Sequence, residues 1–298
     1  MPARLHGAVF GLGHMGKLHA RKLEARGDVK LTCIDPPRGL EAPAGARFDF
    51  AIIASPTTTH HTVAGPLLER GVPCLVEKPL AADLDQARQL AVYEHLTVGH
   101  IERFNPALEP VAHVRPRFIQ AERLSPYGAR KPGMRGTDVD VVADLMIHDL
   151  DLVMSLLEAP TREVRAIGVG VMGGPADIAN ARIERGTGVA VLTASRVSRQ
   201  PVRKLRLVEE EGVYWSIDLL ARTCLRVRWG SGALDGEPVP VPSGDQIERE
   251  HQAFLAAVRG ERAFPVPGHE AVAAMELAAA VRTELSRGAF DTPTPAPR

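Results

Sequence analysis

Three groups of residues in this sequence have types and spacings that could do chemistry. A glycine pattern, G-x-G-x-x-G, starts at Gly11 and is suited to holding phosphate against the backbone. Lys78 ends a short apolar run, where a desolvated ammonium is costly unless it is paired or used. Asp144 and His148 are four residues apart, so a helix would place them on one face. Together these residues could bind a dinucleotide, polarise a hydroxyl group and remove its proton.

The glycine pattern lies between an apolar run at residues 7–10 and a helical pattern, which is the context that a dinucleotide loop requires. In that context Gly11 makes the tight turn, Gly13 lets a pyrophosphate approach the backbone, and Gly16 lets the helix pack on the strand. The helix N-terminus then faces the negative charge. The cofactor-binding candidates in this loop are Gly11, Gly13, His14, Met15 and Gly16.

A second predicted strand, residues 29–34, ends at Asp35, roughly 20 residues beyond the last turn glycine. An acid at this position can bind both ribose hydroxyls of NAD. The alternative is that Asp35 is a turn residue that ends the strand before two prolines. Arg38 lies close enough to leave NADP open as the cofactor.

Lys78 follows a buried strand, since CLVEKPL begins at Cys74 with four residues of a strand pattern. Residues 50–54 form the preceding strand, and the turn after it supplies the further cofactor candidates Ser55, Pro56 and His60. Ligands bind at the carboxyl edge of parallel strands, so Lys78 is a candidate catalytic and substrate-binding residue. Glu77 and Lys78 are also candidate contacts of the cofactor. The alternative is a lysine that reaches solvent at a strand end where Pro79 stops the strand.

The Asp144/His148 pair lies in ADLMIHDLDL, where leucines recur on one helix face. One alternative is an acid near a helix N-terminus and a buried, hydrogen-bonded histidine. Another is a zinc site that includes Asp149. Hydride transfer with a lysine present needs no metal, so we expect none.

Composition narrows the classes of function. The chain has 298 residues, with 36 Lys plus Arg against 36 Asp plus Glu, so no net charge recruits nucleic acid or an anionic membrane. Its 3 cysteines have no paired spacing, and neither a signal peptide nor a membrane-spanning run is evident. These features predict a cytoplasmic protein without nucleic-acid or membrane partners.

The order of elements predicts an α/β fold with two domains and a tail. Strands and helices alternate through residues 1–105, which predicts a dinucleotide-binding Rossmann domain. Strand-like segments at residues 164–171, 188–197, 204–209 and 225–229, with helices at 246–258 and 269–285, predict an α/β substrate domain at 106–290 with an antiparallel sheet. Residues 291–298 have the composition of a disordered tail.

The motifs GLGHMG, ASPTTTHHTVAGPLLERGVPCLVEKPLA and ADLMIHDLDL together resemble the glucose-fructose oxidoreductase, inositol dehydrogenase and MocA (Gfo/Idh/MocA) family of nicotinamide-dependent sugar dehydrogenases. The resemblance implies a Rossmann domain followed by an open, mainly antiparallel sheet that often forms a homodimer or homotetramer interface. It also implies that Lys78, Asp144 and His148 act in one active site. Thr57 stands where the family commonly has Asn, and residues 36–49 are short for the family.

The chemistry implied by this family is oxidation of a secondary alcohol, with NAD as the hydride acceptor. His148 would take the hydroxyl proton, Asp144 would orient its imidazole, and Lys78 would stabilise the developing alkoxide. Lys78 and His148 could also exchange these roles.

The string GHIERFNPA at residues 99–107 resembles the members of this family that oxidise UDP-N-acetylglucosamine at its 3-hydroxyl. That resemblance implies a UDP-3-keto-amino sugar product on a route to lipopolysaccharide or surface polysaccharide, and makes Arg103 and Asn105 substrate candidates. A cationic segment at residues 123–135 could hold a diphosphate through Arg130 and Lys131, with Tyr127 packing on substrate. It could equally be a solvated surface loop. The alternative functions are an inositol or free-sugar dehydrogenase and a non-catalytic dinucleotide sensor.

Overall fold

The computed structural model describes residues 4–126, 140–171, 176–229 and 234–287. The chain divides into two units, one of Met1–Phe104 with Gly244–Met275 and the other of Asn105–Ser243 with Glu276–Arg298. Among the helices of the described ranges, none has the length and apolar character needed to cross a membrane.

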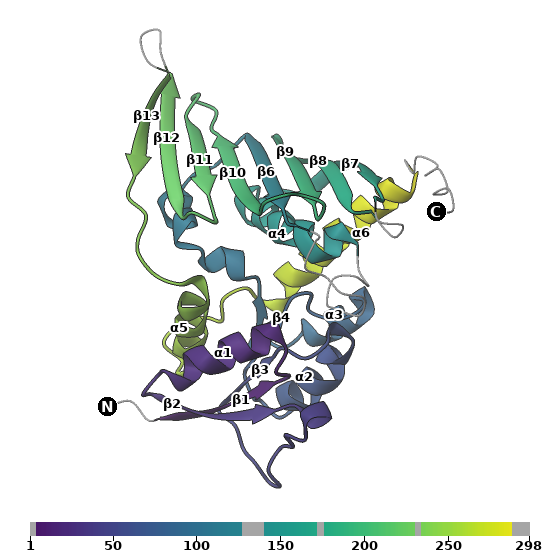
Figure 1. The fold of residues 1–298 in the computed structure, drawn as a ribbon, viewed down its shortest axis with the longest axis vertical. Coiled ribbons are helices and arrows are strands. Elements are labelled where there is room, and N and C mark those ends of the chain that lie inside the picture. The colour runs from purple at the N-terminus through teal and green to yellow at the C-terminus, as the bar shows by residue number, and fades with distance from the viewer. Residues whose placement is uncertain (1–3, 127–139, 172–175, 230–233, 288–298) are drawn as a thin grey trace. The chain divides into compact units, whose positions relative to one another are not determined.

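The first unit is built on a five-stranded parallel sheet in the order β2-β1-β3-β4-β5 (Figure 1). The strands are β1 (Leu5–Phe10), β2 (Val29–Ile34), β3 (Phe50–Ile53), β4 (Cys74–Glu77) and β5 (Leu96–Gly99). Helices α1 (His14–Glu24), α2 (His60–Glu69) and α3 (Leu84–Leu90) lie between them in the chain. All residues of β3, β4 and β5 are buried, which explains their short, continuously apolar pattern. The Rossmann-type domain predicted from the sequence is confirmed.

Two C-terminal segments complete this unit. Helix α5 (Gln246–Val258) buries Phe254 and Leu255 in a cluster with strand residues such as Val9, and the rings of Phe254 and Phe50 meet edge to face with centroids 5.9 Å apart. Helix α6 (Gly268–Arg287) contributes its first part to the same unit. The sequence placed both helices in the second domain, whereas the structure places α5 and only the first part of α6 in the first unit. Apolar side chains of α5 cover the parallel sheet, which explains its place.

The second unit contains an eight-stranded sheet in the order β13-β12-β11-β10-β6-β9-β8-β7. The strands are β6 (Phe118–Leu124), β7 (Thr161–Val169), β8 (Ile178–Arg185), β9 (Gly188–Ser195), β10 (Val202–Val208), β11 (Tyr214–Asp218), β12 (Thr223–Trp229) and β13 (Leu234–Val239). Every neighbouring pair is antiparallel except β6 and β9, which run parallel. The open, mainly antiparallel sheet is therefore confirmed.

One face of this sheet is covered by helices. Figure 1 shows α4 (Ile147–Leu156) and the end of α6 on the same side of it. Side chains alternate accordingly along β11. Trp215 and Ile217 are buried, whereas Tyr214 is partly exposed. The opposite face carries exposed apolar side chains, among them Phe118, Ile167 and Val169.

Candidate active-site residues in each unit

The glycine loop of the first unit has the geometry of a phosphate-binding turn. Gly11 has a φ of +87°, and a Cβ there would lie 2.5 Å from the Ser55 Cα, so only glycine fits. A Cβ on Gly16 would lie 1.8 Å from the Gly11 carbonyl oxygen. At Gly13, in contrast, a Cβ would meet nothing within 4 Å. The loop is thus tight where it packs on the next turn and open at the N-terminus of α1, as a dinucleotide pyrophosphate requires.

Asp35 is fixed beside this loop at the end of β2. It is 7% exposed, and its Oδ2 accepts a hydrogen bond of 2.8 Å from the Leu12 backbone N–H. The Arg38 guanidinium pairs with the same oxygen from a half-exposed position. The carboxylate suits ribose hydroxyls and the guanidinium suits a 2′-phosphate, so both chemistries occur side by side.

His60 joins the turn after β3 to the turn after β4. Its side chain is fully buried, with Nε2 3.0 Å from the Ser55 carbonyl oxygen and Nδ1 3.0 Å from that of Pro79. Ser55 is held further by a 2.8 Å hydrogen bond between its hydroxyl and that of Thr59. Pro56 lies exposed at the start of the short 3₁₀ helix Thr57–Thr59. His60 therefore holds the backbones of the turns after β3 and β4. As a cofactor candidate it would act indirectly, by positioning these two turns.

Glu77 and Lys78 leave β4 in different environments. Glu77 is 3% exposed, and its Oε1 accepts a hydrogen bond of 2.9 Å from His19 Nε2 of α1. Lys78 is half-buried and precedes Pro79 through a cis peptide bond. The structure thus places Lys78 at the carboxyl edge of the parallel sheet, in the same row of turns as Gly11 and Ser55. Ligands of such sheets bind at this edge where the strand order reverses, between β1 and β3.

Asp144 and His148 belong to the second unit. A π-helical turn, Val142–Met146, carries Asp144 and runs directly into α4, which carries His148 as its second residue. Asp140 begins this run, because its Oδ1 accepts hydrogen bonds of 2.9 Å from the backbone N–H groups of Val142 and Ala143. Both candidate side chains are half-buried. Single π turns within α-helices are frequent at functional sites, which supports the assignment.

A buried ion pair that was not predicted from the sequence anchors α4. Arg123 of β6 is 3% exposed and Asp149 is 4% exposed. The Arg123 Nη2 lies 2.7 Å from Asp149 Oδ1, and its Nε reaches both carboxylate oxygens at 3.1 and 3.0 Å. Since Asp149 follows His148 directly, this pair fixes the turn of helix from which the histidine projects.

Arg103 and Asn105 are engaged within their own units. Arg103 Nη1 lies 2.9 Å from Glu270 Oε2 of α6. Asn105 is 3% exposed, accepts a hydrogen bond from the Ala107 N–H at 3.0 Å and donates one to the Leu219 carbonyl at 2.9 Å. These contacts give Asn105 the role of a cap. Tyr127, Arg130 and Lys131 lie outside the described residues.

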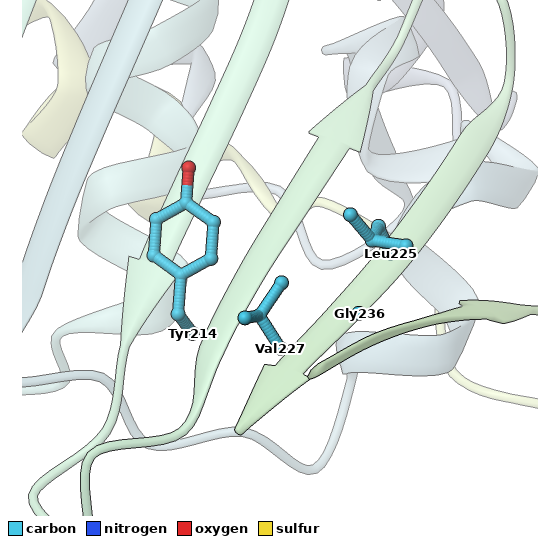
Figure 2. Close-up of a pocket in the computed structure, with 4 residues that line it drawn as sticks. All are labelled: Tyr214, Leu225, Val227 and Gly236. Carbon is cyan, nitrogen blue, oxygen red and sulfur yellow. The ribbon is translucent and has the colours of Figure 1, made fainter. Parts of the chain in front are cut away.

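Within the described ranges, no group of three or more His, Cys, Asp or Glu residues is arranged to hold a metal ion. Asp149, weighed from the sequence as a zinc ligand, is bound by Arg123. The open face of the second sheet has a shallow apolar pocket, lined by Tyr214, Leu225, Val227 and Gly236 of β11 to β13 (Figure 2).

His19 and His251 are the residues near Glu77 that sequence reasoning missed. They are 232 positions apart, yet His19 Nδ1 lies 2.7 Å from His251 Nε2. For each histidine alone, its position on an apolar helix face could have indicated that its side chain is buried. Nothing in the sequence indicated that the two would meet.

Comparisons with known proteins agree with this geometry. The model of the Gfo/Idh/MocA oxidoreductase family with an NAD-binding Rossmann fold matches residues 40–96. UDP-N-acetylglucosamine 3-dehydrogenase of Acidithiobacillus ferrooxidans is 35% identical, over 95% of this chain and 97% of its own. A solved structure of that enzyme, GnnA, superposes with a TM-score of 0.85 at 32% identity and covers 95% of this chain and 98% of its own. Myo-inositol dehydrogenase Hyg17 of Streptomyces leeuwenhoekii is 31% identical over 55% of this chain and 59% of its own.

Proposed function

Because the chain belongs to the Gfo/Idh/MocA family of nicotinamide-dependent oxidoreductases, we propose that it oxidises the 3-hydroxyl of UDP-N-acetylglucosamine to a ketone with NAD. The observation that carries this proposal is the 35% identity to a UDP-N-acetylglucosamine 3-dehydrogenase over 95% of the chain. The inositol dehydrogenase Hyg17 matches over only 55%, so the likeness that extends through the second unit favours the nucleotide sugar.

The residues have the groups that this oxidation needs. A bound nicotinamide supplies the hydride acceptor. His148 takes the hydroxyl proton as general base, and Asp144 orients its imidazole. The Lys78 ammonium donates a hydrogen bond to the oxygen that becomes negative, which favours the transition state more than the ground state. Retention of Lys78, Asp144 and His148 supports an enzyme over a dinucleotide sensor.

We further propose that the substrate diphosphate is held by Arg130 and Lys131, that Arg103 contacts the substrate, and that Tyr127 packs on the sugar nucleotide. Guanidinium groups suit phosphate oxygens because their donors form a planar fork. The product is a UDP-3-keto-amino sugar, which suits a route to lipopolysaccharide in the cytoplasm.

The proposed quaternary structure is a homodimer or homotetramer formed through the open face of the second sheet. Exposed Phe118, Ile167 and Val169 support this, as does the apolar pocket of Figure 2. Sedimentation equilibrium measures the mass directly. A monomer at micromolar concentration would contradict the proposal.

The cofactor preference is the first prediction. Asp35 is held by the Leu12 N–H so that its carboxylate faces the loop, where it accepts from ribose hydroxyls and repels a 2′-phosphate. We expect kcat/KM for NAD to exceed that for NADP, and Asp35→Asn to reduce that ratio at least about tenfold, or about 1.4 kcal/mol. Arg38→Ala is the matched control. Equal use of NAD and NADP by the wild type would contradict the prediction and would mean that Arg38 governs this pocket.

A substrate panel tests the proposed function. NADH absorbance is followed with UDP-N-acetylglucosamine, UDP-N-acetylglucosaminuronate, free sugars and inositols, and each reaction is repeated with a keto acceptor to reveal turnover on tightly bound cofactor. We expect oxidation of UDP-N-acetylglucosamine, with mass spectrometry showing a loss of two hydrogens. Selective oxidation of inositols would favour the alternative dehydrogenase.

A further inference from the structure

A line of hydrogen bonds runs through the core of the first unit and ends at the residue that precedes Lys78. It begins at His251 of α5, passes through His19 of α1 and ends at Glu77 of β4, with distances of 2.7 Å and 2.9 Å. The three side chains are 1%, 0% and 3% exposed. They come from three elements that are far apart in the sequence. Such a buried polar line is costly unless its members satisfy one another, so its retention in an apolar core calls for a role.

Hydrogen-bonding rules fix how this line ends at Glu77. An ionised Glu77 carboxylate only accepts, so His19 must carry its proton on Nε2 and donate to Oε1. Burial, followed by the nearby charge of His19, lowers the pKa of His251 well below its usual range, so this ring is neutral near pH 7. His251 Nε2 and His19 Nδ1 share one hydrogen bond of 2.7 Å, in which one nitrogen donates and the other accepts. The line therefore ends on the Glu77 carboxylate as its final acceptor.

The line acts on the short segment that carries Lys78. Glu77 is the last residue of β4 and pairs in register with Gly99 of β5. A Cβ on Gly99 would lie 3.3 Å from the Glu77 Cδ, so the carboxylate is packed tightly against the neighbouring strand. Lys78 comes next, and alternation along an extended chain directs consecutive side chains to opposite faces. Holding Glu77 in place thus fixes the backbone from which the ammonium extends.

The same line of hydrogen bonds includes a residue of α1, the helix that follows the glycine loop. His19 lies one turn beyond Gly16 on α1, the helix whose N-terminus faces the expected pyrophosphate. α1 and β4 are therefore tied by a side-chain bond as well as by packing. Small displacements of a reacting group reduce rates strongly, so a rigid link between loop and lysine has a catalytic benefit.

We propose that His251 and His19 are positioning residues, which orient Glu77 and through it set the place of Lys78 at the carboxyl edge of the sheet. This inference rests on the proposed role of Lys78 in the dehydrogenase reaction. Neither histidine is proposed to touch substrate. Their effect passes through the Glu77 carboxylate.

Trace acetylation tests the positioning directly. Dilute acetic anhydride labels amines in proportion to their unprotonated fraction and access, and peptide mass spectrometry reads Lys78 against the exposed Lys17 in the same sample. Wild type, His251→Phe and His251→Gln are compared from pH 7 to pH 11 without substrate or cofactor. Glu248→Gln, an exposed change on the same helix, is the matched control. Gln keeps a side-chain amide that can donate to or accept from His19 Nδ1, whereas Phe keeps only the bulk.

We expect the labelling curve of Lys78 to shift in His251→Phe and to stay near wild type in His251→Gln and the control. In turnover, His251→Phe should lower kcat at least about tenfold and leave KM for the sugar and the Kd of NAD within about threefold. Unchanged labelling in His251→Phe would overturn the inference, and so would equal shifts in Phe and Gln, because packing alone would then explain them. If His251→Phe does not fold, His251→Asn, whose amide is too short to reach His19, replaces it with the same expectations. Labelling needs no substrate, so a failure of the proposed function leaves this result readable.

Discussion

At the scale of single residues, the structure explains why a lysine follows a strand of buried residues. Cys74 to Glu77 are all buried, and Lys78 is the first residue that emerges at the edge. Its neighbours on either side are held, Glu77 by His19 and the Pro79 carbonyl by His60. A lysine that only reached for solvent would not require such support. These surroundings support the proposed role of Lys78 in the chemistry.

Lys78→Ala tests that role. Removing a donor that stabilises charge in the transition state should lower kcat by roughly 10² to 10⁴ and leave the Kd of NAD nearly unchanged. Steady-state kinetics give the first quantity and fluorescence titration the second. Lys30→Ala, an exposed lysine on β2, should match wild type. Activity within about tenfold of wild type in Lys78→Ala would remove Lys78 from the chemistry.

At the scale of elements, the sequence predicted what depends on local pattern. Short apolar runs gave the parallel strands, and 3.6-residue periodicity gave α5 with its bounds of Gln246 and Val258. The strand β11 was not predicted, because only Trp215 and Ile217 of its residues are buried and the pattern is brief. The π turn at Val142–Met146 was expected as ordinary helix. Sequence periodicity alone does not separate these two geometries.

Pairings between distant segments could not be predicted. Arg123 and Asp149 each lie among other charged residues in the sequence, and nothing marks them as partners. The fold brings β6 under α4 and excludes water from both side chains. The same holds for His19 and His251. The candidate residues were therefore identifiable by type and motif, whereas the contacts that hold them were not.

The Arg123/Asp149 pair yields a stability prediction. Arg123→Met leaves the Asp149 carboxylate buried without its guanidinium, which should cost about 3–5 kcal/mol. The double variant Arg123→Met/Asp149→Leu should recover much of that loss, because two apolar side chains need no partner. Urea midpoints of the wild type, both single variants and the double variant form a cycle. A double variant as unstable as the sum of the singles would show that the two residues act independently.

At the scale of the whole molecule, buried charges are mostly balanced close by. Besides Arg123 and Asp149, Arg196 Nε lies 2.6 Å from Asp177 Oδ1, and both side chains are buried. Glu250 differs. It is fully buried, and neither carboxyl oxygen has a hydrogen-bond partner among the residues that the structure describes. Burial, and then the negative charge of Glu77, raises the pKa of Glu250 well above its usual range. Glu250 therefore keeps its proton to a higher pH in the folded chain than an exposed glutamic acid does.

This acid should make the stability of the folded chain depend on pH. An unfolded Glu250 loses its proton near its ordinary pKa of 4.5, whereas the folded chain keeps it to a higher pH. Above 4.5 the folded state therefore binds one more proton, so its stability should fall as pH rises toward the folded pKa. Glu250→Gln removes the titration and keeps the shape. Its melting temperature relative to wild type should increase as the pH rises above 4.5, as followed by circular dichroism at one scan rate. Glu248→Gln, an exposed change on the same helix, should follow the wild type at each pH, and parallel curves for Glu250→Gln and wild type would show that Glu250 is ionised in the folded chain.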